Sequence, residues 1–149
     1  MAKACVFCEI ASGAKEAETV YEDGLTIAFL DHRPLFPGHV LLVPREHHPL
    51  LADLPAEQVG PLFQAARLLS RAVQSALDAE GTFLAINNGV SQSVPHVHVH
   101  VIPRRKGDGL KGFFWPRVTY RDGAHQGDVR ARIERAVAAV VTSEQSASK

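Results

Sequence analysis

The sequence lacks the features that would place the protein in a membrane or draw it to nucleic acid. No apolar run approaches the roughly 20 residues that span a bilayer, and the first residues, Met1 to Cys5, have no apolar signal-peptide core. Lysine plus arginine equals aspartate plus glutamate, 16 of each, so net charge gives no general attraction to nucleic acid. We therefore expect a cytoplasmic protein with no membrane partner and no specific nucleic-acid partner.

Neither an internal repeat nor a change in composition divides the chain. Its 149 residues are 46% hydrophobic and 21% charged, which is ordinary for one soluble globular domain with a buried core. The last residues, 143–149, are small and polar. We expect a single domain over residues 1–142 and a disordered tail at 143–149.

What the sequence does contain is a row of three histidines that alternate with three valines: His96, Val97, His98, Val99, His100 and Val101. Strict alternation predicts a β-strand over residues 96–102, because successive side chains of a strand point to opposite faces. The three imidazoles then share one face, with neighbours roughly 6–7 Å apart. Prolines at 95 and 103 bracket this strand.

A lone histidine on a strand is usually just a partly exposed polar residue. Three on one face need a chemical reason, because each can carry a proton near neutral pH. Two reasons are open at this point. Either the row holds a transition metal through neutral imidazoles, or one histidine is a nucleophile that its neighbours orient while they bind an anion.

The only two cysteines form a Cys-Val-Phe-Cys motif at Cys5 and Cys8. In a reducing compartment a disulfide is disfavoured. The pair is then half of a zinc site, two small buried residues, or a redox pair. A thioredoxin-like redox motif needs a strand before it, and few residues precede Cys5, whereas a zinc site can draw on eight histidines.

The remaining patterns predict an α+β fold in two layers, with an antiparallel sheet of about five strands, one long helix and a C-terminal helix. Strands are expected near 18–21 and over 25–30, 39–43, 82–86 and 96–102. The strands at 25–30 and 39–43 pair as a hairpin, and the strand at 82–86 pairs with the histidine strand. The long helix begins near Asp53, is disturbed by Pro61 and ends at Gly81, and the second helix spans about 128–141.

Two polar segments flank the histidine strand. The loop at 87–93 is either a plain hairpin turn or a loop whose amide, hydroxyl and backbone groups bind phosphate. The segment at 104–117 is basic, glycine-rich and aromatic, and it is either a solvated loop or a lid that brings cations and rings to a nucleotide. Asp31, at the end of the 25–30 strand, either caps a turn or binds ribose hydroxyls.

Together these motifs resemble those of the histidine triad superfamily. The family pattern His-φ-His-φ-His-φ-φ, with φ apolar, is met by residues 96–102. Further matches follow the family's order: Cys5–Cys8, Tyr21–Asp23, Phe29–Asp31, Pro37–Val40, Val43–His47 and Gln92–Val94. The resemblance covers residues 5 to about 104 and is strongest to bacterial members and to the fragile-histidine-triad and Hint-like hydrolases. It implies the two-layer fold and a homodimer.

The resemblance also implies a mechanism. His98 attacks the α-phosphorus of a nucleotide, a covalent nucleotidyl-histidine forms, and water releases the nucleoside monophosphate. His100 and Gln92 donate hydrogen bonds to the phosphate, and Ser93 donates to the phosphate or to the leaving group. His39 supports the nucleophile or lines the site.

The nucleotide itself is expected to be a purine nucleotide of the adenosine type. By resemblance Asp31 binds the ribose, Asn87 lies at the phosphate site, and leucine and isoleucine side chains near positions 10 and 30 enclose the base. One departure from the family pattern is a phosphate loop with only Val90 and Ser91 between Asn-Asn-Gly and Gln92. This shortening bears on the choice of substrate more than on the reaction.

The resemblance implies a structural zinc ion and no organic cofactor. Zinc-bearing relatives use two cysteines and two histidines, which correspond here to Cys5, Cys8, His47 and His96, and a Cys₂His₂ set is a closed tetrahedral site. His48 is the adjacent alternative to His47. The zinc would connect the N-terminal arm to the catalytic strand.

Three functions are consistent with these residues. The first is a hydrolase or transferase that cleaves the α-phosphate bond of a nucleoside phosphoanhydride or phosphoramidate, such as a dinucleoside polyphosphate or an AMP-amidate. The second is a metalloenzyme with its ion on His96, His98 and His100. The third is a nucleotide-binding regulatory protein with little turnover.

Overall fold

The computed structural model describes residues 4–111 and 117–149. Contacts between Cα atoms divide the chain into two compact units, Met1–Asp108 and Gly109–Lys149. The prediction of one domain over residues 1–142 stays a prediction. Of the segment at 104–117, residues 112–116 lie outside the described residues, so the predicted lid is not described further.

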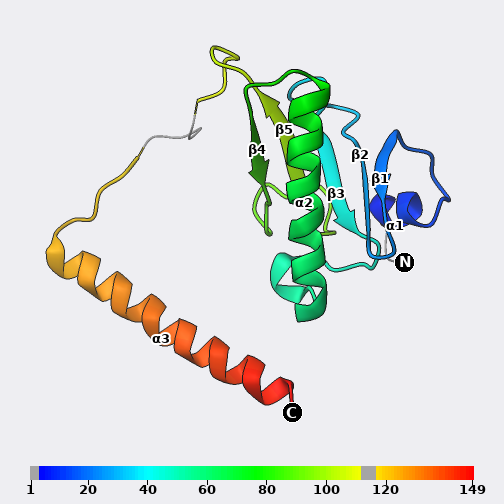
Figure 1. Cartoon of the computed structure of the whole chain (residues 1–149). Coiled ribbons are helices and arrows are strands. Elements are labelled where there is room, and N and C mark those ends of the chain that lie inside the picture. The colour runs from blue at the N-terminus through cyan, green and yellow to red at the C-terminus, as the bar shows by residue number, and fades with distance from the viewer. Residues whose placement is uncertain (1–3, 112–116) are drawn as a thin grey trace. The chain divides into compact units, whose positions relative to one another are not determined.

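The first unit is built on one five-stranded sheet, which confirms the predicted α+β class and antiparallel pairing (Figure 1). Its strands are β1 (Thr19–Glu22), β2 (Thr26–Leu30), β3 (Val40–Pro44), β4 (Gly81–Ala85) and β5 (Val99–Arg104). They lie in the order β1-β2-β3-β5-β4. β2 and β3 form the predicted hairpin, and β4 pairs with β5 as predicted.

The central strands have apolar side chains on both faces, and each face packs against a different helix. Ala28, Val40 and Leu42 face the long helix α2 (Ala56–Ala76), while Phe29 and Leu41 pack with the short helix α1 (Val6–Ala11). This division follows from the two-residue period of a strand. His100, which pairs with Leu41, therefore lies in a sheet that is covered on both faces.

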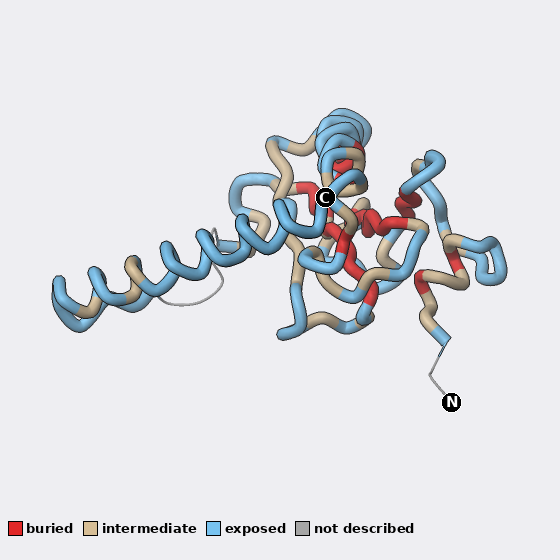
Figure 2. The backbone as a smooth tube through the Cα atoms, turned by 90° about the horizontal axis from the view of Figure 1, so that it is seen from below, coloured by how far each residue is buried: buried red, intermediate tan, exposed pale blue. Residues whose placement is uncertain are grey.

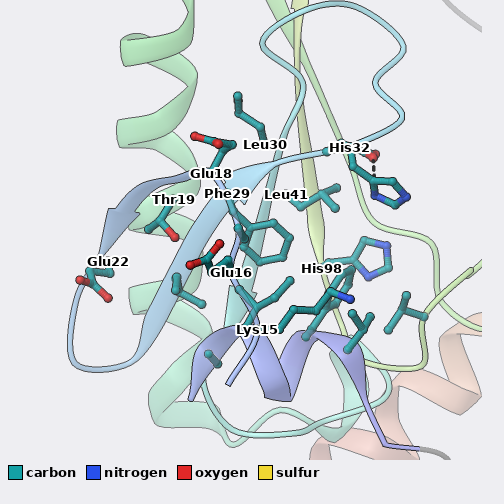
Figure 3. A pocket seen from close by; sticks show the side chains of 18 of the residues that line it. Lys15, Glu16, Glu18, Thr19, Glu22, Phe29, Leu30, His32, Leu41 and His98 are labelled. Carbon is teal, nitrogen blue, oxygen red and sulfur yellow. Dashed lines mark ion pairs between the residues drawn. The ribbon is translucent and has the colours of Figure 1, made fainter. Parts of the chain in front are cut away.

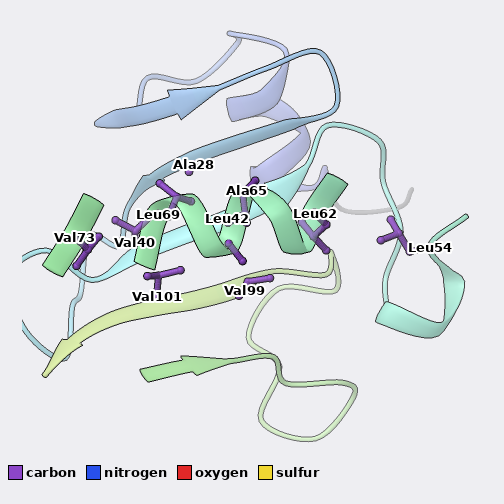
Figure 4. Packing of buried hydrophobic residues seen from close by; sticks show 11 residues of the cluster. Ala28, Val40, Leu42, Leu54, Leu62, Ala65, Leu69, Val73, Val99 and Val101 are labelled. Carbon is purple, nitrogen blue, oxygen red and sulfur yellow. The ribbon is translucent and has the colours of Figure 1, made fainter. Parts of the chain in front are cut away.

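α2 packs through one apolar stripe, Leu62, Ala65, Ala66, Leu69 and Val73. Figure 4 shows Leu62, Ala65, Leu69 and Val73 of α2 together with Val40, Leu42, Val99 and Val101 of β3 and β5, which belong to the same buried cluster. Burial of this kind contributes roughly 1.5–3 kcal/mol for each large aliphatic side chain. In Figure 2 the buried residues gather in the sheet and along the adjoining side of α2.

The boundaries of α2 differ from those predicted. Asp53 does not begin the helix; it ends a 3₁₀ turn, η1 (Leu51–Asp53), and its carboxylate accepts a hydrogen bond from the Leu50 amide. The helix continues through Pro61 and ends at Ala76. The residue in the left-handed conformation is Asp78, with φ of +52°, and Gly81 instead begins β4.

The turn between β2 and β3 holds a glycine that no other residue could replace without strain. Gly38 has φ of +95°, and a Cβ atom added there would lie 2.0 Å from Cδ1 of Leu77, at the end of α2. The backbone of the turn thus approaches α2 closely, and it delivers His39 to the start of β3 in a fixed position.

The histidine row begins before the paired part of its strand. The prediction placed the strand at 96–102, but β5 starts at Val99 and continues through Pro103 to Arg104. The amide of Val97 donates to the carbonyl of His48 at 2.7 Å, so the start of the row is held by the loop after β3. Pro103 is tolerated because the pairing with β3 ends at Val101.

The second unit contains the helix α3 (Gly123–Ala147), of which no residue is buried. It begins five residues before the predicted position 128, since the Asp122 carboxylate accepts a hydrogen bond from the His125 amide as an N-cap. It also runs through 143–147, which we expected to be a disordered tail, and the hydroxyls of Thr142 and Ser146 bond back to helix carbonyls there. No helix among residues 4–111 and 117–149 is long and apolar enough to cross a membrane.

Candidate active site and metal site

A cavity of about 1840 Å³ lies on the α1 face of the sheet. Its lining comes from α1, the loop to β1, strand β2 and the residues after it, and the histidine row (Figure 3). The predicted site residues that line it are Asp31, Ser93, His98 and His100, together with Ile10 and Leu30. The cavity is large enough for a nucleotide, since ligand pockets commonly span about 300–1,000 Å³.

His98 is held in one tautomer. Its side chain is buried, and its Nδ1 atom lies 2.8 Å from the backbone carbonyl oxygen of His96. A carbonyl oxygen can only accept, so Nδ1 must carry the proton and donate it. The other nitrogen, Nε2, then has a free lone pair, which is the form of imidazole that can attack an electrophile.

His100 is held by a chain of hydrogen bonds that starts at the backbone. The Leu35 amide donates to Nδ1 of His39 at 3.2 Å, so Nε2 of His39 carries the proton. That nitrogen lies 2.9 Å from Nδ1 of His100, which must accept. The Nε2 atom of neutral His100 is therefore a donor. His39 thus acts on His100 and does not hold the second nitrogen of His98.

His39 and His100, the two histidines joined by these hydrogen bonds, are neutral near pH 7. Burial, followed by the neighbouring His98 and His39, lowers the pKa of His100 to about 4 against the opposing effect of Asp31. Burial also lowers the pKa of His39, although the Asp31 carboxylate acts in the opposite direction. Asp31 lies 3.8 Å from Nδ1 of His39, beyond hydrogen-bond distance, and it accepts a hydrogen bond from the Arg33 amide.

The structure does not bring the whole predicted nucleotide set together. The amide of Gln92 is bonded at both ends, donating to the Pro49 carbonyl at 2.7 Å and accepting from the Gly89 amide at 2.9 Å. Gln92 and Asn87 are not among the residues that line the cavity. The glutamine thus connects the shortened loop to the loop after β3, while the next residue, Ser93, lines the cavity.

On the other side of α1 the predicted metal ligands Cys5, Cys8, His47 and His96 come together. One ligand atom of each lies within 4.8 Å of all the others. Nδ1 of His96 is 3.5 Å from the sulfur of Cys5 and 3.5 Å from that of Cys8, and Nδ1 of His47 is 3.4 Å from the sulfur of Cys8. The edge of a tetrahedron between a thiolate and an imidazole bound to zinc is about 3.6 Å.

The orientation of His96 also fits a metal. Its Nε2 atom lies 2.8 Å from the carbonyl oxygen of Pro44, so Nε2 carries the proton and Nδ1 is free to bind an ion. Burial lowers the pKa of His96, which favours the neutral form that a metal requires. His48 is not part of this group; its ring lies 3.3 Å from the Glu46 carboxylate.

The alternative of one ion bound by the whole row is not supported by the described residues. The candidate ligand groups there place His96 with the cysteines and His100 with Asp31 and His39, and none joins His96, His98 and His100. The 2.9 Å separation in the His39–His100 pair is that of a hydrogen bond and is shorter than the roughly 3.3 Å edge of a tetrahedral zinc site.

Sequence reasoning missed one functional side chain and two backbone groups. The ring of Phe7 lies edge-on to His96 and His98, with ring-centre separations of 5.9 and 5.2 Å. Its position between Cys5 and Cys8 in the sequence was the signal that could have identified it. The carbonyl of Pro44 and the amide of Leu35 set histidine tautomers, and no sequence signal marks such a backbone contact.

Comparison with known proteins shows the family to which the chain belongs. The model of the HIT domain family matches residues 12–107, and the chain belongs to that family. A HIT-like protein of Mycobacterium tuberculosis is 42% identical over 108 residues, which is 71% of this chain and 75% of that protein.

Two relatives have names that describe activities. Adenylylsulfatase HINT3 of Arabidopsis thaliana is 36% identical over 71% of this chain. The asymmetrical bis(5′-nucleosyl)-tetraphosphatase of Schizosaccharomyces pombe is 37% identical over 62% of it. The chain spans about half the length of each, 55% and 52%.

Solved structures show the same fold. A HIT family protein from Bacillus subtilis matches with a TM-score of 0.80 and 30% identity, over 89% of this chain and 96% of that one. A zinc-bound histidine triad family protein from Mycobacterium smegmatis matches with a TM-score of 0.69 and 36% identity, over 89% and 97%.

Proposed function

We propose that this protein cleaves the α-phosphate bond of a nucleoside phosphoanhydride or phosphoramidate and passes through a covalent intermediate on His98. The observation that carries the proposal is the tautomer of His98. Its Nδ1 atom donates to the His96 carbonyl, so its Nε2 atom keeps a free lone pair, and the residue lines the large cavity. The names of the plant and yeast relatives, an adenylylsulfatase and a nucleosyl tetraphosphatase, support a nucleotide as the substrate.

In the first step Nε2 of His98 forms a bond to the α-phosphorus, and the bond from phosphorus to the leaving group breaks. In the second step water attacks the same phosphorus, the phosphorus–nitrogen bond breaks, and the nucleoside monophosphate leaves. Negative charge spreads over the phosphoryl oxygens in both transition states, so donors that face them supply much of the rate.

The neutral imidazole of His100 supplies such a donor through Nε2, because its Nδ1 atom accepts from His39. The rings of His98 and His100 are 4.9 Å apart, so both can reach one phosphoryl group. We assign Ser93 the same role or the protonation of the leaving group, and Asp31 the ribose hydroxyls. Gln92 has no role here, since its side-chain amide is bonded at both ends to backbone groups, the amide of Gly89 in its own loop and the carbonyl of Pro49 in the loop after β3. Asn87 at the phosphate site stays a prediction.

We also propose that Cys5, Cys8, His47 and His96 hold zinc. All four ligand positions are filled by protein atoms, so the ion would be structural and would not bind substrate. The zinc-bound relative supports this assignment. An adenosine-type base, a homodimer and a cytoplasmic location stay predictions, and nucleotide profiling and sedimentation will check the first two.

The test uses purified protein and α-labelled nucleotides of both substrate classes. Wild-type protein quenched in base, where a phosphorus–nitrogen bond to histidine survives, should retain label and release monophosphate. His98→Asn should do neither, while His125→Asn, a histidine change on α3 outside the cavity, should behave as wild type. Folded wild-type protein that neither binds label nor releases monophosphate across the panel would contradict the proposal, and tight binding without turnover would favour a regulatory protein.

A further inference from the structure

We propose that α1 is a wall of the nucleotide cavity held in place by the metal site, with Phe7 as the residue that positions His98. The inference rests on the proposed function and deepens it, because it makes formation of the substrate site depend on zinc. Three features of the N-terminal arm carry it, and each comes from a different set of contacts.

The first feature is that α1 cannot persist alone. It has only six residues, and its N-cap residue, Cys5, makes no side-chain hydrogen bond to the helix. Isolated helices shorter than about 12 residues are marginal in water. What fixes α1 is burial of Phe7 and Ile10 against β2 and β3, together with the positions of the two cysteines beside His96.

The second feature is that the same helix forms part of the cavity. Val6, Phe7, Ile10 and Ala11 all line it, so the cavity loses one side if α1 detaches. The cysteine ligands bracket two of these residues in the sequence. A metal bound by Cys5 and Cys8 on one side and by His47 and His96 on the other would tie this wall to the sheet.

The third feature is a double connection from the metal site to His98. The His96 residue offers its ring to the cysteines, and its carbonyl oxygen accepts the proton of His98 Nδ1 at 2.8 Å. Phe7 meets both rings at once and also packs edge-on against Phe29, with ring centres 5.4 Å apart. A movement of α1 or of His96 would therefore change the orientation of the attacking imidazole.

Two consequences separate the roles of metal and ring. Loss of the metal should free α1, which weakens nucleotide binding and opens the loop after α1 to proteases. Truncation of Phe7 should leave the metal bound but let His98 turn, which lowers kcat more than it changes KM. Supporting groups of this kind typically change activity 10–100-fold.

The experiment compares zinc-loaded wild-type protein with chelator-treated protein, Cys8→Ser, Phe7→Ala, Phe7→Leu and Phe63→Leu. Phe63 is a half-exposed residue of α2 and serves as the matched control. Four quantities are measured: zinc content, the rate of tryptic cleavage after the exposed Lys15, the affinity for AMP, and kcat with KM.

Metal-free protein and Cys8→Ser should be cut after Lys15 and bind AMP more weakly, each by at least about tenfold. Phe7→Ala should keep its zinc, resist trypsin and lose kcat by about tenfold, and Phe7→Leu should recover part of that loss. Phe63→Leu should match wild type in all four measurements.

The inference is overturned if metal-free protein resists trypsin and binds AMP as well as the zinc-loaded form, or if the wild-type protein takes up no zinc. It is also overturned if Phe7→Ala has an unchanged kcat. The tryptic cleavage rate and the zinc content can be measured without turnover. An inactive wild-type protein would therefore count against the proposed function, while these two measurements would still show whether the metal holds α1 in place.

Discussion

Replacing Gly38 by alanine should destabilise the protein through two separable effects. The φ of +95° disfavours any residue with a Cβ atom by about 1–2 kcal/mol. In addition the new Cβ would lie 2.0 Å from Cδ1 of Leu77, and moving that side chain off its rotamer costs about 0.5–1.5 kcal/mol. Together they should lower the free energy of unfolding by about 1.5–3.5 kcal/mol.

A double-mutant cycle separates the two effects. In a Leu77→Ala background the clash is absent, so Gly38→Ala should cost only the conformational part, about 1–2 kcal/mol. Gly24→Ala is the control, since nothing lies within 4 Å of its added Cβ and its φ is not positive; it should change stability by less than about 0.5 kcal/mol.

Urea unfolding followed by circular dichroism measures the four proteins of the cycle and the Gly24→Ala control. With a slope of about 1–3 kcal/mol per molar, the expected loss shifts the midpoint by roughly 0.5–3.5 M. An identical loss in the presence and absence of Leu77, or a loss no larger than that of Gly24→Ala, would refute the reasoning. Because Gly38 directly precedes His39, Gly38→Ala should also lose activity in the absence of urea.

Three further predictions concern pH, an arginine and a helix cap. The pKa of His100 lies at about 4, below its usual value of 6.5, so its neutral form stabilises the fold above pH 6.5, and this is lost as the pH falls from 6.5 through 4. After a discount for its partial exposure the loss is about 1–2 kcal/mol, and thermal melts of His100→Gln should show a shallower dependence on pH. Arg45→Met should lower the free energy of unfolding by about 2 kcal/mol, because the guanidinium donates to the carbonyls of Asp23 and Ala11 and to the Glu22 carboxylate. An unchanged midpoint of urea unfolding would contradict this. Asp122→Ala should reduce the helix signal of the full-length protein, because an N-cap is worth about 1 kcal/mol.

Much of the sheet could be predicted from local patterns. Short apolar runs bounded by turn residues, and the alternation of the histidine row, located the strands within one to three residues at their start and within two at their end, and turn residues predicted the β2–β3 hairpin. The four metal-ligand candidates also came together as expected from the resemblance. These features depend on residue type and spacing, which the sequence displays directly.

Other features depend on contacts between distant segments and could not be predicted in this way. β5 starts at Val99 because the amide of Val97 is already bonded to His48, a residue 49 positions earlier by their numbers. The helix α1 is too short to show a helical period. Gln92 donates to the carbonyl of Pro49, 43 positions away in the sequence, whereas its pattern match alone suggested a phosphate ligand.

The metal candidates also have a consequence for how the chain is made. Cys5 and His96 are 91 positions apart, so during synthesis the cysteines emerge long before the ring that they meet. Closing the loop between these two residues costs about 4–5 kcal/mol in chain entropy. A ribosome-bound chain shorter than this span has no finished nucleotide cavity, and newly made protein should gain the ability to bind nucleotide in a single late step.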